Sequence, residues 1–155
     1  MNVKFFLINS SFLVINLSFL FFQVSAEPFS GTQLYLKQNY EAAVDYWSNK
    51  AKQGDPRSLF LLGMMHLEGS GLSLKKTKAH QYLKQAALGD YRLAFPVLGM
   101  LYEEGGVGIP WEPDQAENLF LKASEEFKEI QVLAETGDVF AQRVLGLDVS
   151  QRQGG

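Results

Sequence analysis

The chain has 155 residues, of which 46% are hydrophobic and 20% are charged, and its formal net charge is −3. It contains no cysteine, which excludes a disulfide framework, thiolate metal sites and a cysteine nucleophile. The acidic balance argues against nucleic-acid binding, because that function needs a basic surface.

The first 26 residues predict an export signal. Lys4 is the only charged residue before Glu27, and the apolar stretch after it ends in Val24-Ser25-Ala26. A positive start, an apolar run and small residues before the cut are typical of a signal peptide cleaved after Ala26. We therefore expect an exported chain, periplasmic or secreted. The alternative is a retained membrane anchor, because a span needs about 20 apolar residues, and membrane contact is expected only in that case.

The rest of the chain, residues 27–149, repeats with a period of 36 residues. We expect three units, at about 40–75, 76–112 and 113–149, followed by an unstructured tail at 150–155. The positions that carry the repeat are Ala43, Trp47, Ala51, Gly54, Leu62, Gly63, Ala79, Tyr82, Ala87, Ala94, Leu98, Gly99, Tyr102, Gly137, Ala141, Leu145 and Gly146.

Each unit predicts two helices joined by a tight turn. In the first unit, Ala43, Trp47 and Ala51 recur at helical spacing, and Gly54-Asp55-Pro56 follows them. Glycine suits the end of one helix, while aspartate and proline suit the start of the next. A single hairpin cannot bury both of its faces, so the units are expected to stack into a solenoid.

The third unit departs from the period, because Gly137-Asp138 comes about ten residues late. Apolar residues such as Phe127 and Ile130 continue at helical spacing through the extra segment. Since neither glycine nor proline interrupts it, we expect one long helix over about 113–135. The alternative is a kink at 124–126 that begins a partial extra repeat.

The string AAVDYWSNKAKQGDPRSLFLLGMMHLEGSG resembles a Sel-1-like repeat, a relative of the tetratricopeptide repeat. The similarity lies in its small residues, aromatic pair, Gly-Asp, Leu-Gly and Gly-x-Gly, and it extends over about residues 31–149. His66, Leu83 and Asp90 depart from the family pattern. The resemblance implies an all-α protein, a right-handed α/α solenoid of about three repeats. It also implies an adaptor or scaffold that binds a protein or peptide.

The sequence shows no convergent catalytic groups and no metal-ligand spacing. The two histidines, His66 and His80, are interpreted as packing residues, because no second ligand or acid cluster accompanies them. Gly69-Ser70-Gly71 follows a helix, which favours a linker over a phosphate loop. The carboxylates of Glu103-Glu104 are neighbours on a helix and do not face each other. We therefore expect no catalytic residue, no metal and no cofactor.

Trp111 lies in a loop that is longer than its counterpart one repeat earlier. We favour the interpretation that Trp111 fills the groove between the second and third units. The alternative is an exposed contact residue, because tryptophan is enriched among residues that dominate binding energy.

These features predict a non-catalytic adaptor that binds a protein or peptide on the concave face of the solenoid. If first helices line that face, as in tetratricopeptide solenoids, the candidate contacts are Asp45, Asn49, Gln81, Lys84, Gln85 and Asn118, with Trp111 at the rim. Two alternatives stay open. One is a small exported hydrolase on the same scaffold, acting on cell wall or β-lactams, as suggested for some cysteine-rich relatives. The other is a self-assembling envelope component that pairs through its uncovered last helix.

Overall fold

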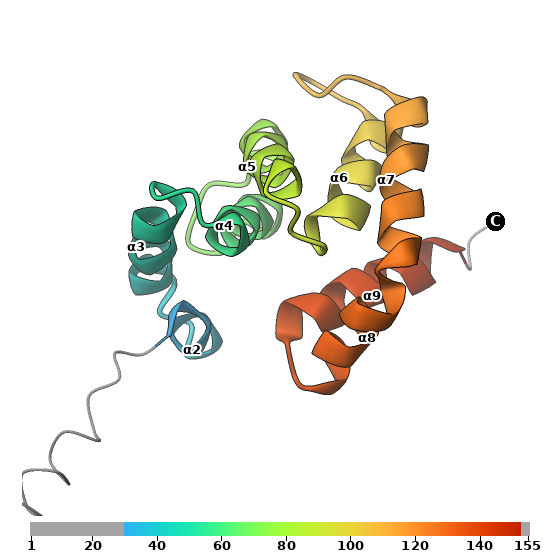
Figure 1. Cartoon of the computed structure of the whole chain (residues 1–155). Coiled ribbons are helices and arrows are strands. Elements are labelled where there is room, and N and C mark those ends of the chain that lie inside the picture. The colour runs from blue at the N-terminus through green and yellow to red at the C-terminus, as the bar shows by residue number, and fades with distance from the viewer. Residues whose placement is uncertain (1–29, 153–155) are drawn as a thin grey trace, which may run out of the picture.

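The computed structural model describes residues 30–152, and within them it contains eight α-helices and one isolated β-bridge (Figure 1). The predicted signal segment, residues 1–26, lies outside the described residues. Within the described range, no helix is both long and apolar enough to cross a membrane. The helices are α2 (Gly31–Leu36), α3 (Tyr40–Ala51), α4 (Pro56–Glu68), α5 (Lys76–Leu88), α6 (Ala94–Glu104), α7 (Pro113–Glu125), α8 (Phe127–Glu135) and α9 (Val139–Arg152).

Each helix from α2 to α6 packs on the helix that follows it, and α8 packs on α9. Successive hairpins therefore stack side by side, which confirms the predicted all-α solenoid. Figure 1 shows α2 to α7 as an arc, with the α8–α9 pair turned back beneath it.

The helix starts follow from local side-chain chemistry. Ser30 forms a reciprocal capping box with Gln33, and the Asn39 side chain accepts a hydrogen bond from the backbone of Ala42. Asp55 accepts the backbone N–H of Ser58 at 2.9 Å, which confirms its predicted role as the cap of α4. Asp138 does the same for the first turn of α9. These contacts satisfy backbone donors that have no partner within the helix.

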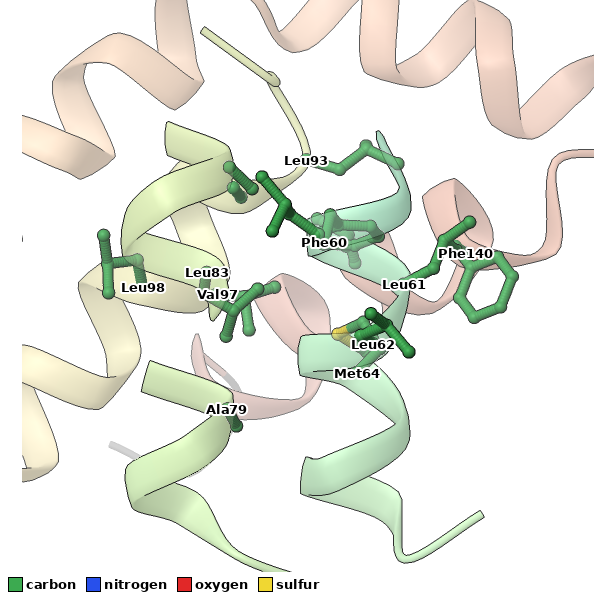
Figure 2. Close-up of a cluster of buried hydrophobic side chains, with 14 of the residues drawn as sticks. Phe60, Leu61, Leu62, Met64, Ala79, Leu83, Leu93, Val97, Leu98 and Phe140 are labelled. Carbon is green, nitrogen blue, oxygen red and sulfur yellow. The ribbon is translucent and has the colours of Figure 1, made fainter. Parts of the chain in front are cut away.

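The core runs along the inside of the stack and centres on α4. Phe60, Leu61 and Met65 are almost completely buried, and Leu83 and Val97 from α5 and α6 pack against this cluster (Figure 2). Because α4 is covered on nearly every side, its apolar residues do not form a single stripe. It is therefore an interior helix, with neighbours on both faces.

Most positions that carry the repeat lie in the core or beside it. Those that are buried are Ala43, Trp47, Leu62, Gly63, Ala79, Ala94, Leu98, Gly99, Tyr102 and Ala141. Half-buried positions are Ala51, Tyr82, Ala87 and Leu145. Gly54 and Gly137 are exposed at helix ends with left-handed backbone, while Gly146 is exposed on α9. The predicted unit boundaries themselves stay predictions.

The single long helix expected over 113–135 is wrong. α7 ends at Glu125 and α8 begins at Phe127, with Glu126 between them at φ −92° and ψ 1°. The break lets α8 leave the line of α7 and pack on α9, where Ile130 and Ala134 are buried. The kink, left open from the sequence, is therefore present because tertiary burial outweighs local helix continuity.

The C-terminal helix is longer than predicted. α9 continues to Arg152, so residues 150–152 are helical instead of belonging to an unstructured tail. No helix breaker precedes Gly154 in this stretch, which is why the helix can continue. Residues 153–155 lie outside the described part of the chain.

Candidate interaction surfaces

The loop between α6 and α7 presents apolar side chains to solvent. The backbone groups of Gly106 and Ile109 exchange two hydrogen bonds of 3.0 Å, which places Val107 at the tip of a tight turn. Val107 is 96% exposed and Trp111 is 70% exposed. The backbone N–H of Glu112 donates to the carbonyl of Tyr102 at 3.0 Å, so the base of this loop is tied to α6.

Trp111 does not fill the groove between repeats, and the interpretation favoured from the sequence is wrong. Ile109 occupies that buried role, with only 4% of its surface exposed. The turn at Gly106 directs Ile109 inward, and the indole two residues later stays outside. The structure therefore places Trp111 as the alternative described it, on the surface.

A second loop contributes to the same edge. A Cβ at Gly108 would lie 2.8 Å from the Thr77 side chain, and Lys76 pairs with Glu104 at 2.7 Å. These contacts place the α6–α7 loop against the start of α5. Leu74, which precedes α5 by two residues, is 64% exposed. We call Leu74, Val107 and Trp111, three exposed apolar residues of the α4–α5 and α6–α7 loops, the loop edge.

The six candidate contacts on the first helices are all exposed. Their side chains form no hydrogen bond or ion pair with other described residues. They are Asp45 and Asn49 on α3, Gln81, Lys84 and Gln85 on α5, and Asn118 on α7. Helices α3, α5 and α7 form the outer side of the arc in Figure 1. That these six residues contact a partner stays a prediction.

The concave side is lined by α2, α4 and α6, and α9 lies on it. Three rings surround Phe140 of α9: Tyr35 at 5.1 Å, Trp47 at 6.1 Å and Phe60 at 6.4 Å between centroids. They come from three different helices, and Phe140 is 1% exposed. We call Tyr35, Trp47 and Phe60 the inner pocket. The expected open concave groove is filled at this point by the chain itself.

An ion-pair network closes the rim of the inner pocket. Arg143 donates to the Tyr35 Oη at 2.7 Å and to the carboxylate of Glu68, and the Tyr35 hydroxyl donates to Glu68 at 2.7 Å. Burial and the hydrogen bond to Glu68 raise the pKa of Tyr35, which keeps its hydroxyl a neutral donor. At the start of α9, Arg57 pairs with Asp138 at 3.4 Å.

Sequence reasoning missed this network, although a signal for it exists. Phe140 and Arg143 occupy the repeat positions that Arg57 and Phe60 hold in the first unit. In α9 the phenylalanine thus stands where α4 has arginine, and the arginine stands where α4 has phenylalanine. In the structure Phe140 packs on Phe60, while Arg57 pairs with Asp138 and Arg143 pairs with Glu68.

The two histidines pack against aromatic rings. His66 stacks on Tyr82 with 5.8 Å between centroids, and its Nδ1 lies 2.9 Å from the Ser73 carbonyl. His80 meets the edge of Tyr102 at 5.1 Å. Burial, followed by the charge of Lys84, lowers the pKa of His80. Within residues 30–152, no three His, Asp or Glu side chains are grouped so as to hold a metal ion.

The exposed carboxylates serve as partners in ion pairs between elements. Glu104 pairs with Lys76, and Arg92 pairs with Glu126 and with Glu129, the latter at 2.9 Å. Arg92 lies in the turn before α6, so it bridges to both sides of the break between α7 and α8. These contacts link neighbouring hairpins along the outside of the stack.

A family model described as the Sel1 repeat matches the chain three times, at residues 29–55, 56–91 and 89–126. The matches together cover more than half of the sequence. The chain belongs to the Sel1 repeat family. Sel1 repeats generally mediate protein–protein interactions, which is consistent with a surface that carries uncovered apolar side chains.

Solved Sel1 repeat structures share this fold. A Sel1 repeat protein from Oxalobacter formigenes is 28% identical, with a TM-score of 0.56 over 68% of this chain. A protective antigen present in uropathogenic Escherichia coli strains, c5321, is 24% identical with a TM-score of 0.51 over 73% of this chain. The chain spans 46% of the first protein's length and 26% of the second's.

Proposed function

We propose that this Sel1 repeat chain is a non-catalytic exported adaptor, and that its protein partner docks on the loop edge. The observation that supports this most directly is Trp111, a large side chain that stays 70% exposed within an ordered loop. Tryptophan contributes a disproportionate share of binding energy when a partner covers it. Val107 in the same loop and Leu74 in the α4–α5 loop are also exposed apolar side chains.

The outer helices carry further candidate contacts. Gln81, Lys84 and Gln85 on α5 are exposed and carry the polar groups that usually surround an apolar contact. Asp45, Asn49 and Asn118 stay further candidates on α3 and α7. The concave face is a weaker candidate than the sequence suggested, because Phe140 and Arg143 already occupy part of it.

The test compares capture of a partner from an envelope extract by the wild-type chain and by the W111A variant. We expect one protein to bind the wild type and to lose at least about tenfold in retention on W111A, the effect of removing a hot-spot residue. F127A is the matched control, because Phe127 is also exposed but lies on α8, away from the loop edge. Equal capture by W111A and the wild type would refute the proposal.

A further inference from the structure

The α8–α9 hairpin is joined to the rest of the solenoid through a break that the sequence does not require. No glycine or proline occurs between residues 114 and 136, so the backbone of α7 can continue into α8. The third Sel1 match ends at residue 126, the same point. The hairpin is therefore a unit with its own hinge at Glu126.

Tertiary contacts hold the break in place. Arg92 pairs with Glu126 at the hinge and with Glu129 in the first turn of α8. The Ser124 hydroxyl donates to the Leu121 carbonyl at 2.7 Å, a backbone contact that bends helices. Without these restraints, local preference favours the straight helix, which carries α9 away from the inner pocket.

If α9 leaves the inner pocket, only a helix with particular side chains can replace it. It presents three aromatic rings, with the carboxylate of Glu68 at one end and the guanidinium of Arg57 at the other. Its occupant needs a helix with an aromatic residue, an arginine one turn later and an acidic residue at its start. Asp138, Phe140 and Arg143 supply this set in this order, and a second copy of the chain carries the same set.

We propose that two copies of this chain exchange their α8–α9 hairpins, with α7 and α8 straightened into one helix and each α9 seated in the partner's inner pocket. Exchange reproduces every pocket contact of the closed chain, so only the hinge changes between the two forms. The proposal is independent of the loop edge and of the protein partner proposed there.

The first test uses a pair of charge reversals. E68R places two guanidinium groups together at the rim of the pocket, and R143E places two carboxylates together. When the two variants are unfolded, mixed and refolded, exchange gives a heterodimer in which both rims pair opposite charges. We expect light scattering of the mixture to show much more of a species with twice the mass of one chain than either variant gives alone, because only the heterodimer relieves the like-charge contacts. A mixture that stays monomeric refutes exchange.

The second test acts on the hinge and keeps both pockets native. R92A removes the ion pairs across the break, and we expect its dimer dissociation constant to fall about two- to fivefold, the usual effect of exposed ion pairs. F127P should favour the closed monomer. Proline is tolerated at the first position of a helix, where residue 127 lies in the closed chain, but it disrupts the interior of the straightened helix. It is expected to stay monomeric. Dimerisation of F127P at the wild-type level would contradict the hinge, whether or not the charge-reversed variants fold.

Discussion

Gly54 and Asp90 occupy the same repeat position with the same left-handed backbone. The φ angle is +83° at Gly54 and +59° at Asp90. Glycine adopts this conformation freely, whereas a residue with a Cβ is strained in it. The departure from the repeat pattern at Asp90 is therefore a local strain that the stack tolerates.

This difference predicts opposite effects of two substitutions. A Cβ at Gly54 meets no described atom within 4 Å, so G54A costs only the backbone strain, about 1 kcal/mol. D90G relieves the same strain and is expected to raise the unfolding free energy by up to about 0.5 kcal/mol, because aspartate tolerates this conformation better than most residues. Urea unfolding measures both. A stabilising G54A would contradict the explanation.

His80 makes the stability depend on pH. Its Nε2 is buried with no hydrogen-bond partner among the described residues, and burial followed by the charge of Lys84 lowers its pKa, against a smaller opposing effect of Glu112. As the pH falls through the ordinary value of 6.5, the unfolded chain binds the proton first. The folded state therefore loses stability between that value and the lower pKa of folded His80.

H80F keeps an aromatic ring at this position and removes the titration. We expect the wild type to lose more stability than H80F between about pH 7.5 and pH 5, as measured by the urea midpoint. The difference between the two chains isolates His80 from the carboxylates, which titrate in both. Identical pH profiles would show that the lowered pKa has no part in stability.

At the scale of helices, the Leu-Gly position decides how closely neighbours approach. A Cβ on Gly63 would lie 2.9 Å from the Leu83 side chain, and one on Gly99 would lie 2.8 Å from Phe120. The glycine thus allows α4 to pack on α5 and α6 to pack on α7. Gly146 holds the equivalent position on α9, where a Cβ meets no described atom within 4 Å.

A glycine-to-alanine substitution is therefore expected to change the free energy of unfolding in opposite directions at Gly63 and at Gly146. G63A forces overpacking and should destabilise by about 1–3 kcal/mol. G146A meets no such neighbour and should stabilise by up to about 1 kcal/mol, because alanine favours helix. Denaturation midpoints of the two variants give the comparison. Stabilisation by G63A would show that α4 and α5 are not held by close approach.

The sequence predicted these hairpins well because the determinants are local. Helical spacing in α3, the Gly-Asp-Pro turn and the cap at Asp55 all act within a few residues. The break at Glu126 was only the alternative in the sequence analysis, because its cause is not local: it is the burial of Ile130 and Ala134 against α9. The favoured position of the Trp111 side chain was wrong for a similar reason. The turn from Gly106 to Ile109 decides that Ile109 is buried and that the indole is exposed.

At the scale of the whole molecule, Phe140 joins the two ends of the arc. The inner pocket draws rings from α2, α3 and α4, so its filling links the first helices to the last one. The repeat register relates Phe140 and Arg143 to Arg57 and Phe60, but it does not show that α9 folds back onto the first helices, which is why an open concave groove was expected.

Loss of this ring should weaken the whole stack. F140A is expected to lower the free energy of unfolding by about 3–5 kcal/mol, the range for emptying a buried aromatic site. W111A should change it by no more than about 0.5 kcal/mol, because an exposed side chain loses little packing. Chemical denaturation of both variants provides the measurement. A decrease of less than about 1 kcal/mol in the free energy of unfolding of F140A would mean that α9 is not part of the core.

The central claim is that binding occurs at the loop edge of this adaptor and not in its concave side. The most direct measurement places a photo-reactive amino acid at position 111, and separately at position 57 at one end of the inner pocket, and irradiates each chain in an envelope extract. We expect a discrete cross-linked partner from position 111 and none from position 57, although the Arg57 side chain is 52% exposed. Cross-linking from position 57 with none from position 111 would place the partner at the inner pocket and contradict docking on the loop edge.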